Sequence, residues 1–137
     1  MSDHKAKDVN IYMEVDTENL NQQNVETKVK FSDNNGDRQN GTPENFVSKV
    51  YRDKKVTWSG SAKNGSSDEV VITNITRKED GGSEIWKKID PKNDGTVEAK
   101  IKDKKVTGTE NYDVHFTVNG VSYTVDPKLQ MDLEHTA

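Results

Sequence analysis

Oxygen-bearing side chains between residues 33 and 44 form the segment of this sequence best suited to binding a metal ion. They alternate at Asp33, Asn35 and Asp37, and Glu44 occupies the twelfth position counted from Asp33. Ca²⁺ takes about six to eight oxygen ligands, and this alternation supplies several of them from one loop. Arg38, however, stands where the helix-loop-helix calcium motif requires glycine. Two interpretations follow: a calcium site formed by the four oxygen-bearing residues, or a turn-rich loop that binds nothing.

Trp86 is the aromatic residue best placed to contact a ligand or partner. It follows Gly81 and Gly82 and precedes Lys87 and Lys88, as expected of a loop or a sheet edge. A tryptophan in such a position can stack on the apolar face of a sugar or anchor a partner protein. The alternative is that Trp86 fills the end of the hydrophobic core.

Catalytic chemistry has few candidates in this sequence. The chain contains no cysteine, and its three histidines are His4, His115 and His135. His115 shares a predicted strand face with Asp113, where a paired surface histidine is the expected outcome. The motifs of nucleophile elbows, phosphate loops, dinucleotide sites and zinc proteases do not occur. We therefore predict that the protein is not an enzyme, has no catalytic residues and has no cofactor, with calcium as the one candidate ligand ion.

The charge balance restricts the partners that the protein can have. The sequence has 24 acidic and 20 basic side chains, a net charge of −4, and its basic residues are dispersed along the chain. Nucleic-acid binding requires a concentrated basic surface, and an anionic membrane surface attracts basic segments, so neither partner is expected. The N-terminal residues are polar and lack the apolar core of a signal peptide, which predicts a cytoplasmic protein.

The segments of the chain that carry these residues are predicted to be β-strands. Apolar residues alternate with polar ones, as in half-buried strands, and a composition of 29% apolar residues suits sheets with one solvated face. We therefore predict an all-β fold, a Greek-key β-sandwich of immunoglobulin-like or cupredoxin-like type with about eight short strands. One domain is expected at 9–131, with a polar tail at 1–8 and a C-terminal tail at 132–137. The clearest alternating runs span 9–15, 25–31, 70–75, 97–101 and 112–118.

Three local sequence patterns predict where turns and an edge strand occur. Asn119 and Gly120 lie between two alternating runs and predict a two-residue hairpin. The residues 80–82 predict a turn, since they read Asp-Gly-Gly. Pro127 ends the last hairpin strand, and the following residues 129–131 are expected to form an exposed edge strand.

Several short motifs resemble known protein families. The run 53–59, Asp-Lys-Lys-Val-Thr-Trp-Ser, and the run 112–116, Tyr-Asp-Val-His-Phe, resemble strands of immunoglobulin-like and cupredoxin-like sandwiches. The second half also resembles bacterial inclusion-body proteins, through Thr-Trp-Ser at 57–59, the strand at 70–75, and the closing Phe-Thr-Val and Tyr-Thr-Val-Asp-Pro-Lys-Leu at 116–118 and 123–129. That resemblance implies a soluble, non-enzymatic sandwich that self-associates or binds a partner, and it carries over no functional residues.

Two functions are expected from these observations. The first is a non-enzymatic, self-associating structural protein of inclusion-body type, whose partner is a second copy of itself joined through the edge strand at 129–131. The alternative is a ligand-binding sandwich that takes calcium or a carbohydrate at the 33–44 loop or near Trp86.

Overall fold

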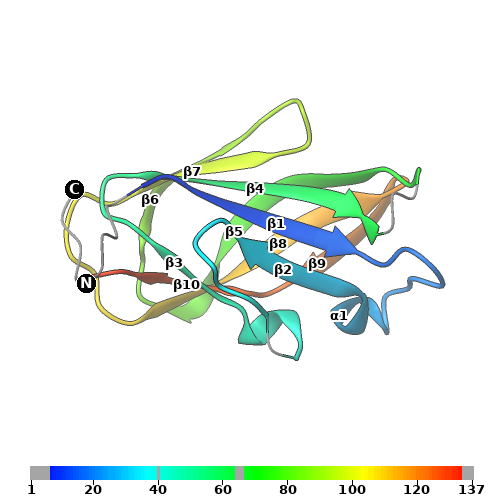
Figure 1. Ribbon diagram of the computed structural model, residues 1–137, viewed down its shortest axis with the longest axis horizontal. Coiled ribbons are helices and arrows are strands. Elements are labelled where there is room, and N and C mark those ends of the chain that lie inside the picture. The colour runs from blue at the N-terminus through cyan, green and yellow to red at the C-terminus, as the bar shows by residue number, and fades with distance from the viewer. Residues whose placement is uncertain (1–6, 40, 64–66, 134–137) are drawn as a thin grey trace.

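The computed structural model describes residues 7–39, 41–63 and 67–133, apart from the side chain of Asp80. These residues form ten strands, one helical turn and one 3-10 turn (Figure 1). In chain order the elements are β1 (Val9–Val15), α1 (Val25–Lys28), β2 (Val29–Asp33), η1 (Pro43–Asn45), β3 (Val47–Val50), β4 (Lys55–Ala62), β5 (Val70–Gly82), β6 (Trp86–Pro91), β7 (Val97–Ile101), β8 (Thr109–Val118), β9 (Val121–Val125) and β10 (Lys128–Met131).

Two five-stranded sheets pack face to face (Figure 1). Sheet A has the order β2-β1-β4-β7-β6, and sheet B has the order β3-β10-β8-β5, with β9 also paired to β8. Each sheet contains one parallel pair, β1 with β4 and β3 with β10, among antiparallel neighbours. The predicted all-β sandwich is confirmed, with ten strands in the described residues instead of about eight.

Strict alternation of side chains creates the hydrophobic core. In β1 every second residue is buried, from Val9 to Val15, while Tyr12 and Glu14 face outward. The strand β8 follows the same rule, because its buried residues alternate along its whole length. At the centre of the core, the Trp58 indole N–H donates to the Tyr112 hydroxyl at 3.0 Å, and the two rings meet edge to face. This period of two is the pattern that a half-buried strand requires.

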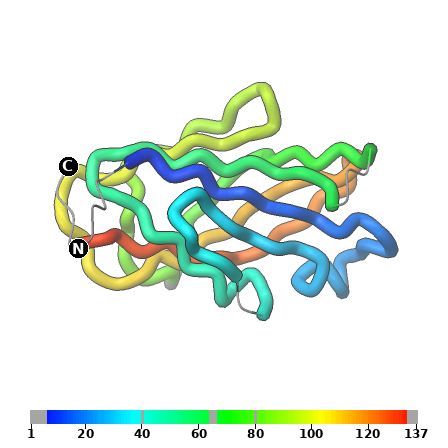
Figure 2. The backbone as a smooth tube through the Cα atoms, viewed as in Figure 1, coloured from blue at the N-terminus to red at the C-terminus, as the bar shows by residue number. Residues whose placement is uncertain are grey.

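The chain changes sheets between β2 and β3. Figure 2 follows it from β2 in sheet A through a loop and the turn η1 to β3 in sheet B. Stacked rings of Phe31 and Phe46, 5.5 Å apart, join the two ends of this crossing. The loop at 34–39 therefore lies where one edge of each sheet comes together, which matters for the candidate site below.

The predicted strand at 25–31 is wrong in its first half. Residues Val25–Lys28 form the helical turn α1, and the strand starts at Val29. Local hydrogen bonds favour the turn, because the Thr27 amide donates to the Asn24 carbonyl and the Asn21 amide donates to the Asn24 side chain. Alternation over two residues could not separate this turn from a strand, since Val25 is buried in either conformation.

The predicted turn at residues 80–82 is also wrong, because β5 continues through them to Gly82. A Cβ atom on Gly81 would lie 2.5 Å from the Asn111 carbonyl oxygen, and one on Gly82 would lie 2.6 Å from that of Thr109. Gly82 also has a φ of +89°. Here the glycines permit close approach of β5 to β8 across a register shift.

The C-terminal strand β10 does not form an edge. It pairs with β8 on one side and β3 on the other, and Leu129 is fully buried. The strands β9 and β10 lie one after the other along the same side of β8, separated at Pro127. The proline ends one strand as predicted, but the chain resumes pairing immediately after it. The prediction of an exposed edge at 129–131 is therefore wrong.

The predicted hairpin at Asn119 and Gly120 is present, with positive φ angles of 50° and 86° at the two turn residues. These angles match a primed two-residue turn.

No helix in the described part of the chain is long and apolar enough to cross a membrane. Most of the predicted tails at 1–8 and 132–137 lies outside the described residues.

Candidate functional site

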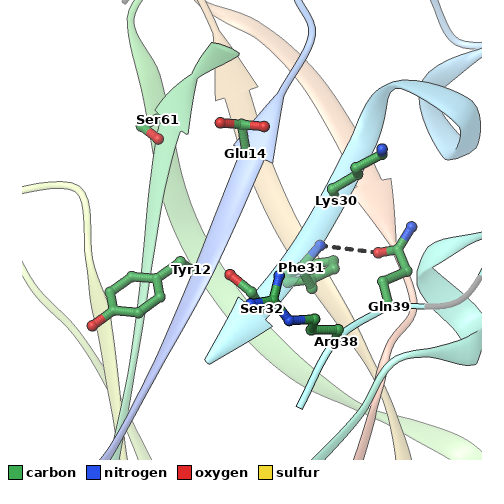
Figure 3. Close-up of a pocket in the computed structure, with 8 residues that line it drawn as sticks. All are labelled: Tyr12, Glu14, Lys30, Phe31, Ser32, Arg38, Gln39 and Ser61. Atoms are coloured by element: carbon green, nitrogen blue, oxygen red, sulfur yellow. Dashed lines mark hydrogen bonds between the residues drawn. The ribbon is translucent and has the colours of Figure 1, made fainter. Parts of the chain in front are cut away.

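A depression of about 470 Å³ lies on the outer face of sheet A, over β1, β2 and β4 and beside the 34–39 loop (Figure 3). Tyr12 is 44% exposed there, although it lies in the middle of a strand with a neighbour on each side. The depression combines one exposed aromatic ring, that of Tyr12, with charges of both signs. Its lining residues are Tyr12, Glu14, Lys30, Phe31, Ser32, Arg38, Gln39 and Ser61.

Sheet register explains why these side chains meet. Tyr12 pairs with Ser32 on β2 and with Ser59 on β4, so small side chains flank the ring on both sides. One row along the sheet, Glu14 pairs with Lys30 on β2. Residues opposite each other in neighbouring strands share a face at about 5 Å, so both rows project from the same surface.

Gln39 lies at the rim of the depression, and its side-chain amide hydrogen-bonds the backbone of β2 as a neighbouring strand would. Its Oε1 accepts from the Phe31 amide at 3.0 Å, and its Nε2 donates to the Val29 carbonyl at 3.0 Å. Arg38 forms an isolated bridge with Ser32. These contacts occupy the outer edge of β2, where unpaired backbone groups would otherwise invite another strand.

Three of the four predicted calcium ligands lie together, but their polar atoms already have partners in the protein. Asp33 Oδ1 accepts from the amides of Asn35 and Asp37 at 2.9 Å, and its Oδ2 accepts from the buried Ser48 hydroxyl at 2.5 Å. Asn35 Oδ1 accepts from the Tyr51 hydroxyl at 2.9 Å. The Asp-x-Asn-x-Asp pattern therefore joins β2 to β3.

The same loop covers the outer edge of β3. Asp37 Oδ2 accepts from the Lys49 amide at 2.9 Å, and Asn35 Nδ2 donates to the Lys49 carbonyl at 3.3 Å. Glu44, the fourth predicted ligand, lies in η1 and contacts the Thr42 hydroxyl at 3.4 Å. In the described residues, no three His, Cys, Asp or Glu side chains converge in a metal-binding group. Calcium binding here stays a prediction.

The Asp37 carboxyl group has a perturbed pKa. Its pKa is raised from 3.8 to about 6: burial is the largest cause and the adjacent Asp33 also raises it, while the hydrogen bond from the Lys49 amide lowers it. Because the folded pKa is above the ordinary value, folding favours the neutral form of Asp37. Its contribution to stability is complete below pH 3.8 and is lost as pH rises through 6.

We expect Asp37→Asn to raise the melting temperature at pH 7 and to leave it unchanged near pH 4. Asparagine keeps an acceptor for the Lys49 amide and carries no charge to desolvate, so the gain is on the order of 1–2 kcal/mol after allowance for solvent screening. Thermal unfolding followed by circular dichroism between pH 4 and pH 8 measures the difference. The exposed Glu79→Gln serves as control, and an equal gain at both pH values would contradict the assignment.

Trp86 is only 4% exposed, which leaves little of its ring for a ligand. One face lies under the Arg77 guanidinium, whose central carbon is 4.6 Å from the ring centre, and the ring meets Tyr112 edge to face at 5.7 Å. The structure places Trp86 in the core at the end of the sandwich, as the alternative interpretation expected. A sugar could stack on this face of the ring only if the Arg77 side chain moved away from it.

An ion pair between a buried carboxylate and a partly exposed guanidinium, which the sequence motifs did not indicate, lies next to Trp86. The Glu110 carboxylate is fully buried, pairs with the Arg77 guanidinium and accepts from the Ile85 amide at 2.6 Å. Arg77 also donates to the Trp86 carbonyl at 2.8 Å. The pair therefore fastens β5 and β8 of sheet B to the start of β6 in sheet A.

The ring nitrogens of His115 both face threonine hydroxyls. Nε2 lies 2.7 Å from the Thr76 hydroxyl, and Nδ1 lies 3.2 Å from that of Thr124. Asp113 instead pairs with Lys78 at 3.0 Å. His115 is thus a surface histidine with local partners, and His4 and His135 lie outside the described residues.

Sequence reasoning missed both the depression and the Arg77–Glu110 ion pair, although the sequence held one signal for each. The alternation of β1 already directed Tyr12 and Glu14 outward, which marks an aromatic ring on a solvated face. Glu110 stands in phase with the core residues Tyr112 and Val114, and a carboxylate in that position requires a buried partner. The edge-covering role of Gln39 had no such signal, because it depends on the path of the loop.

The described residues thus form a β-sandwich of two mixed sheets, in which side chains of one loop cover the edges of β2 and β3. No protein-family model and no curated protein matches this chain. Among solved structures it is similar to the crystal structure of the inclusion body protein PixA from Burkholderia cenocepacia J2315. The TM-score is 0.67 at 15% sequence identity, over 95% of this chain and 98% of that chain. The resemblance to inclusion-body proteins is therefore confirmed at the level of the fold.

Proposed function

We propose that this chain is a non-enzymatic, self-associating protein of inclusion-body type that acts in the cytoplasm. The observation that carries the proposal is the shared fold, which extends over almost the whole length of both this chain and the inclusion body protein PixA. The candidate site supports it, since a surface depression with an exposed ring suits contact with a large partner surface.

Self-association of this chain requires a route other than pairing of sheet edges at β2 and β3. The Gln39 amide occupies backbone groups on β2, and Asn35 and Asp37 occupy those of Lys49 on β3. Natural sheets use such coverage to prevent strand addition. Strand addition at β2 and β3 is therefore disfavoured, which favours assembly through a sheet face.

Two further edges carry similar features. On β6, Lys87 and Lys88 are exposed beside a register shift and Pro91 ends the strand, all of which disfavour pairing with another chain. On β9, the Gln22 side chain donates to the Ser122 carbonyl at 2.6 Å. These contacts strengthen the case for assembly through a face.

Light scattering on a sizing column, over a wide range of protein concentration, tests the proposal. A monomer has a mass of 15.4 kDa, and we expect a defined larger species whose fraction rises with concentration. A mass of one chain at every concentration would overturn self-association.

The alternative function is ligand binding by the 33–44 loop, favoured by the adjacent Asp33 and Asp37 carboxyl groups. The same column run with calcium and then with a chelator separates the two functions. Self-association of the proposed type is indifferent to calcium. A calcium-dependent mass or melting temperature would favour the loop site.

A further inference from the structure

We propose that the face around Tyr12 is the surface through which two copies of this chain pack, related by a two-fold axis. This inference rests on the proposed function and names its interface. It joins three observations on one face of sheet A: an exposed ring, a depression beside it, and neighbouring charges of opposite sign that have no ion-pair partner among the described residues.

The exposed ring and the depression lie together on this face, and Tyr12 is one of the lining residues. Tyr12 projects between Ser32 and Ser59, whose small side chains leave its ring uncovered, and the 470 Å³ depression lies next to it. A two-fold interface uses the same patch on both subunits, so a projection must meet a hollow of its own surface. Tyr12 of each copy then enters the depression of the other.

The charges on this face are also self-complementary. Glu14 and Lys30 pair in register, yet among the described residues neither has an ion-pair partner within 4.0 Å. By contrast, Lys55 and Glu98 on the same sheet pair at 3.8 Å. In the two-fold arrangement, Glu14 of each copy faces Lys30 of the other, which gives two equivalent contacts. Each of these charged groups then has an ion-pair partner.

The remaining lining supports the same interface. Arg38 is exposed on the rim and, in the described part of the chain, has no ion-pair partner within 4.0 Å. Tyrosine and arginine are the residues that most often dominate binding energy at protein interfaces. The surface is also rigid before contact, since β1 lies between two strands and Gln39 is fixed by two backbone hydrogen bonds. Little conformational freedom is lost when such a surface binds.

Charge reversal gives a sharp test, because the contact predicts which combinations associate. Glu14→Lys alone and Lys30→Glu alone each set like charges against each other twice. We expect either variant to raise the concentration at half-association by about tenfold or more, measured by light scattering. An equimolar mixture of the two variants restores opposite charges at both contacts, and we expect a mixed dimer to form within about threefold of the wild-type concentration.

The controls carry the same change of net charge elsewhere. Glu79→Lys and Lys104→Glu replace exposed residues of β5 and of the β7–β8 loop, and neither should alter the mass. Tyr12→Ser should also abolish association, while its melting temperature stays near that of the wild type because the ring is on the outer face.

The possible outcomes separate the interface from the proposed function. A wild-type chain that stays monomeric overturns the proposed function itself. A wild-type chain that associates, with Glu14→Lys and Lys30→Glu variants that associate equally well alone, overturns the Tyr12 interface and leaves self-association standing. Loss in the single variants without recovery in their mixture would overturn the two-fold pairing of Glu14 with Lys30.

Discussion

Replacing Arg77 by alanine is expected to lower the free energy of unfolding by about 3–5 kcal/mol. Glu110 is fully buried, and Arg77 supplies its charged partner. Without the guanidinium, a carboxylate stays in the core with only backbone donors, and the Trp86 carbonyl and ring lose their contacts with Arg77. Removal of one member of a buried pair costs far more than the pair contributes, because the other charge is left uncompensated.

Urea unfolding followed by circular dichroism measures this loss. The matched control is Glu84→Gln, because Glu84 contacts the same guanidinium at 3.8 Å but is 61% exposed, and we expect a loss below about 1 kcal/mol. Combining Arg77→Met with Glu110→Gln removes both charges and retains an acceptor for the Ile85 amide. This double variant should recover most of the loss, and failure to recover it would show that Arg77 acts mainly through packing.

Replacing Trp58 by alanine is expected to cost about 3–5 kcal/mol, which is typical of removing a large aromatic residue from a core. Trp58 is fully buried in β4, with its ring edge to face against Tyr112. The truncation creates a cavity between the sheets and removes the donor to the Tyr112 hydroxyl. Neighbouring strands restrict collapse of that cavity, since β1 and β7 flank β4.

Tyr112→Phe separates packing from hydrogen bonding at the same place. It retains the ring and leaves the Trp58 N–H buried without its acceptor, for an expected loss of about 1–3 kcal/mol. Both variants are measured by urea unfolding. If Tyr112→Phe cost as much as Trp58→Ala, the hydrogen bond and not the packed volume would dominate this part of the core.

Some features of the molecule followed from short-range patterns. The alternation at 9–15 and 112–118 predicted β1 and most of β8, because side chains in a strand alternate between two faces whatever lies beyond them. Asn119 and Gly120 predicted their hairpin, since the positive φ angles are a property of the two residues themselves.

Other predictions failed where a residue type has more than one structural use. The Gly81 and Gly82 pair reads as a turn, but here it permits close approach of two strands. The segment 129–131 reads as an edge after Pro127, but it lies between β3 and β8. Pairing with β3 is parallel and spans about eighty residues of sequence, a contact that no local pattern encodes.

The sequence by itself determined that this protein is an all-β sandwich. For strands such as β1 and β8, it also determined which side chains face the core. Only the tertiary structure decided what the polar residues do. It assigned Asn35, Asp37 and Gln39 to the edges of β2 and β3, and it brought Tyr12 and Arg38 to the lining of one depression. The reason is physical: burial follows from each strand's own periodicity, whereas a polar side chain takes its role from whichever distant backbone groups and charges the fold brings within hydrogen-bonding distance.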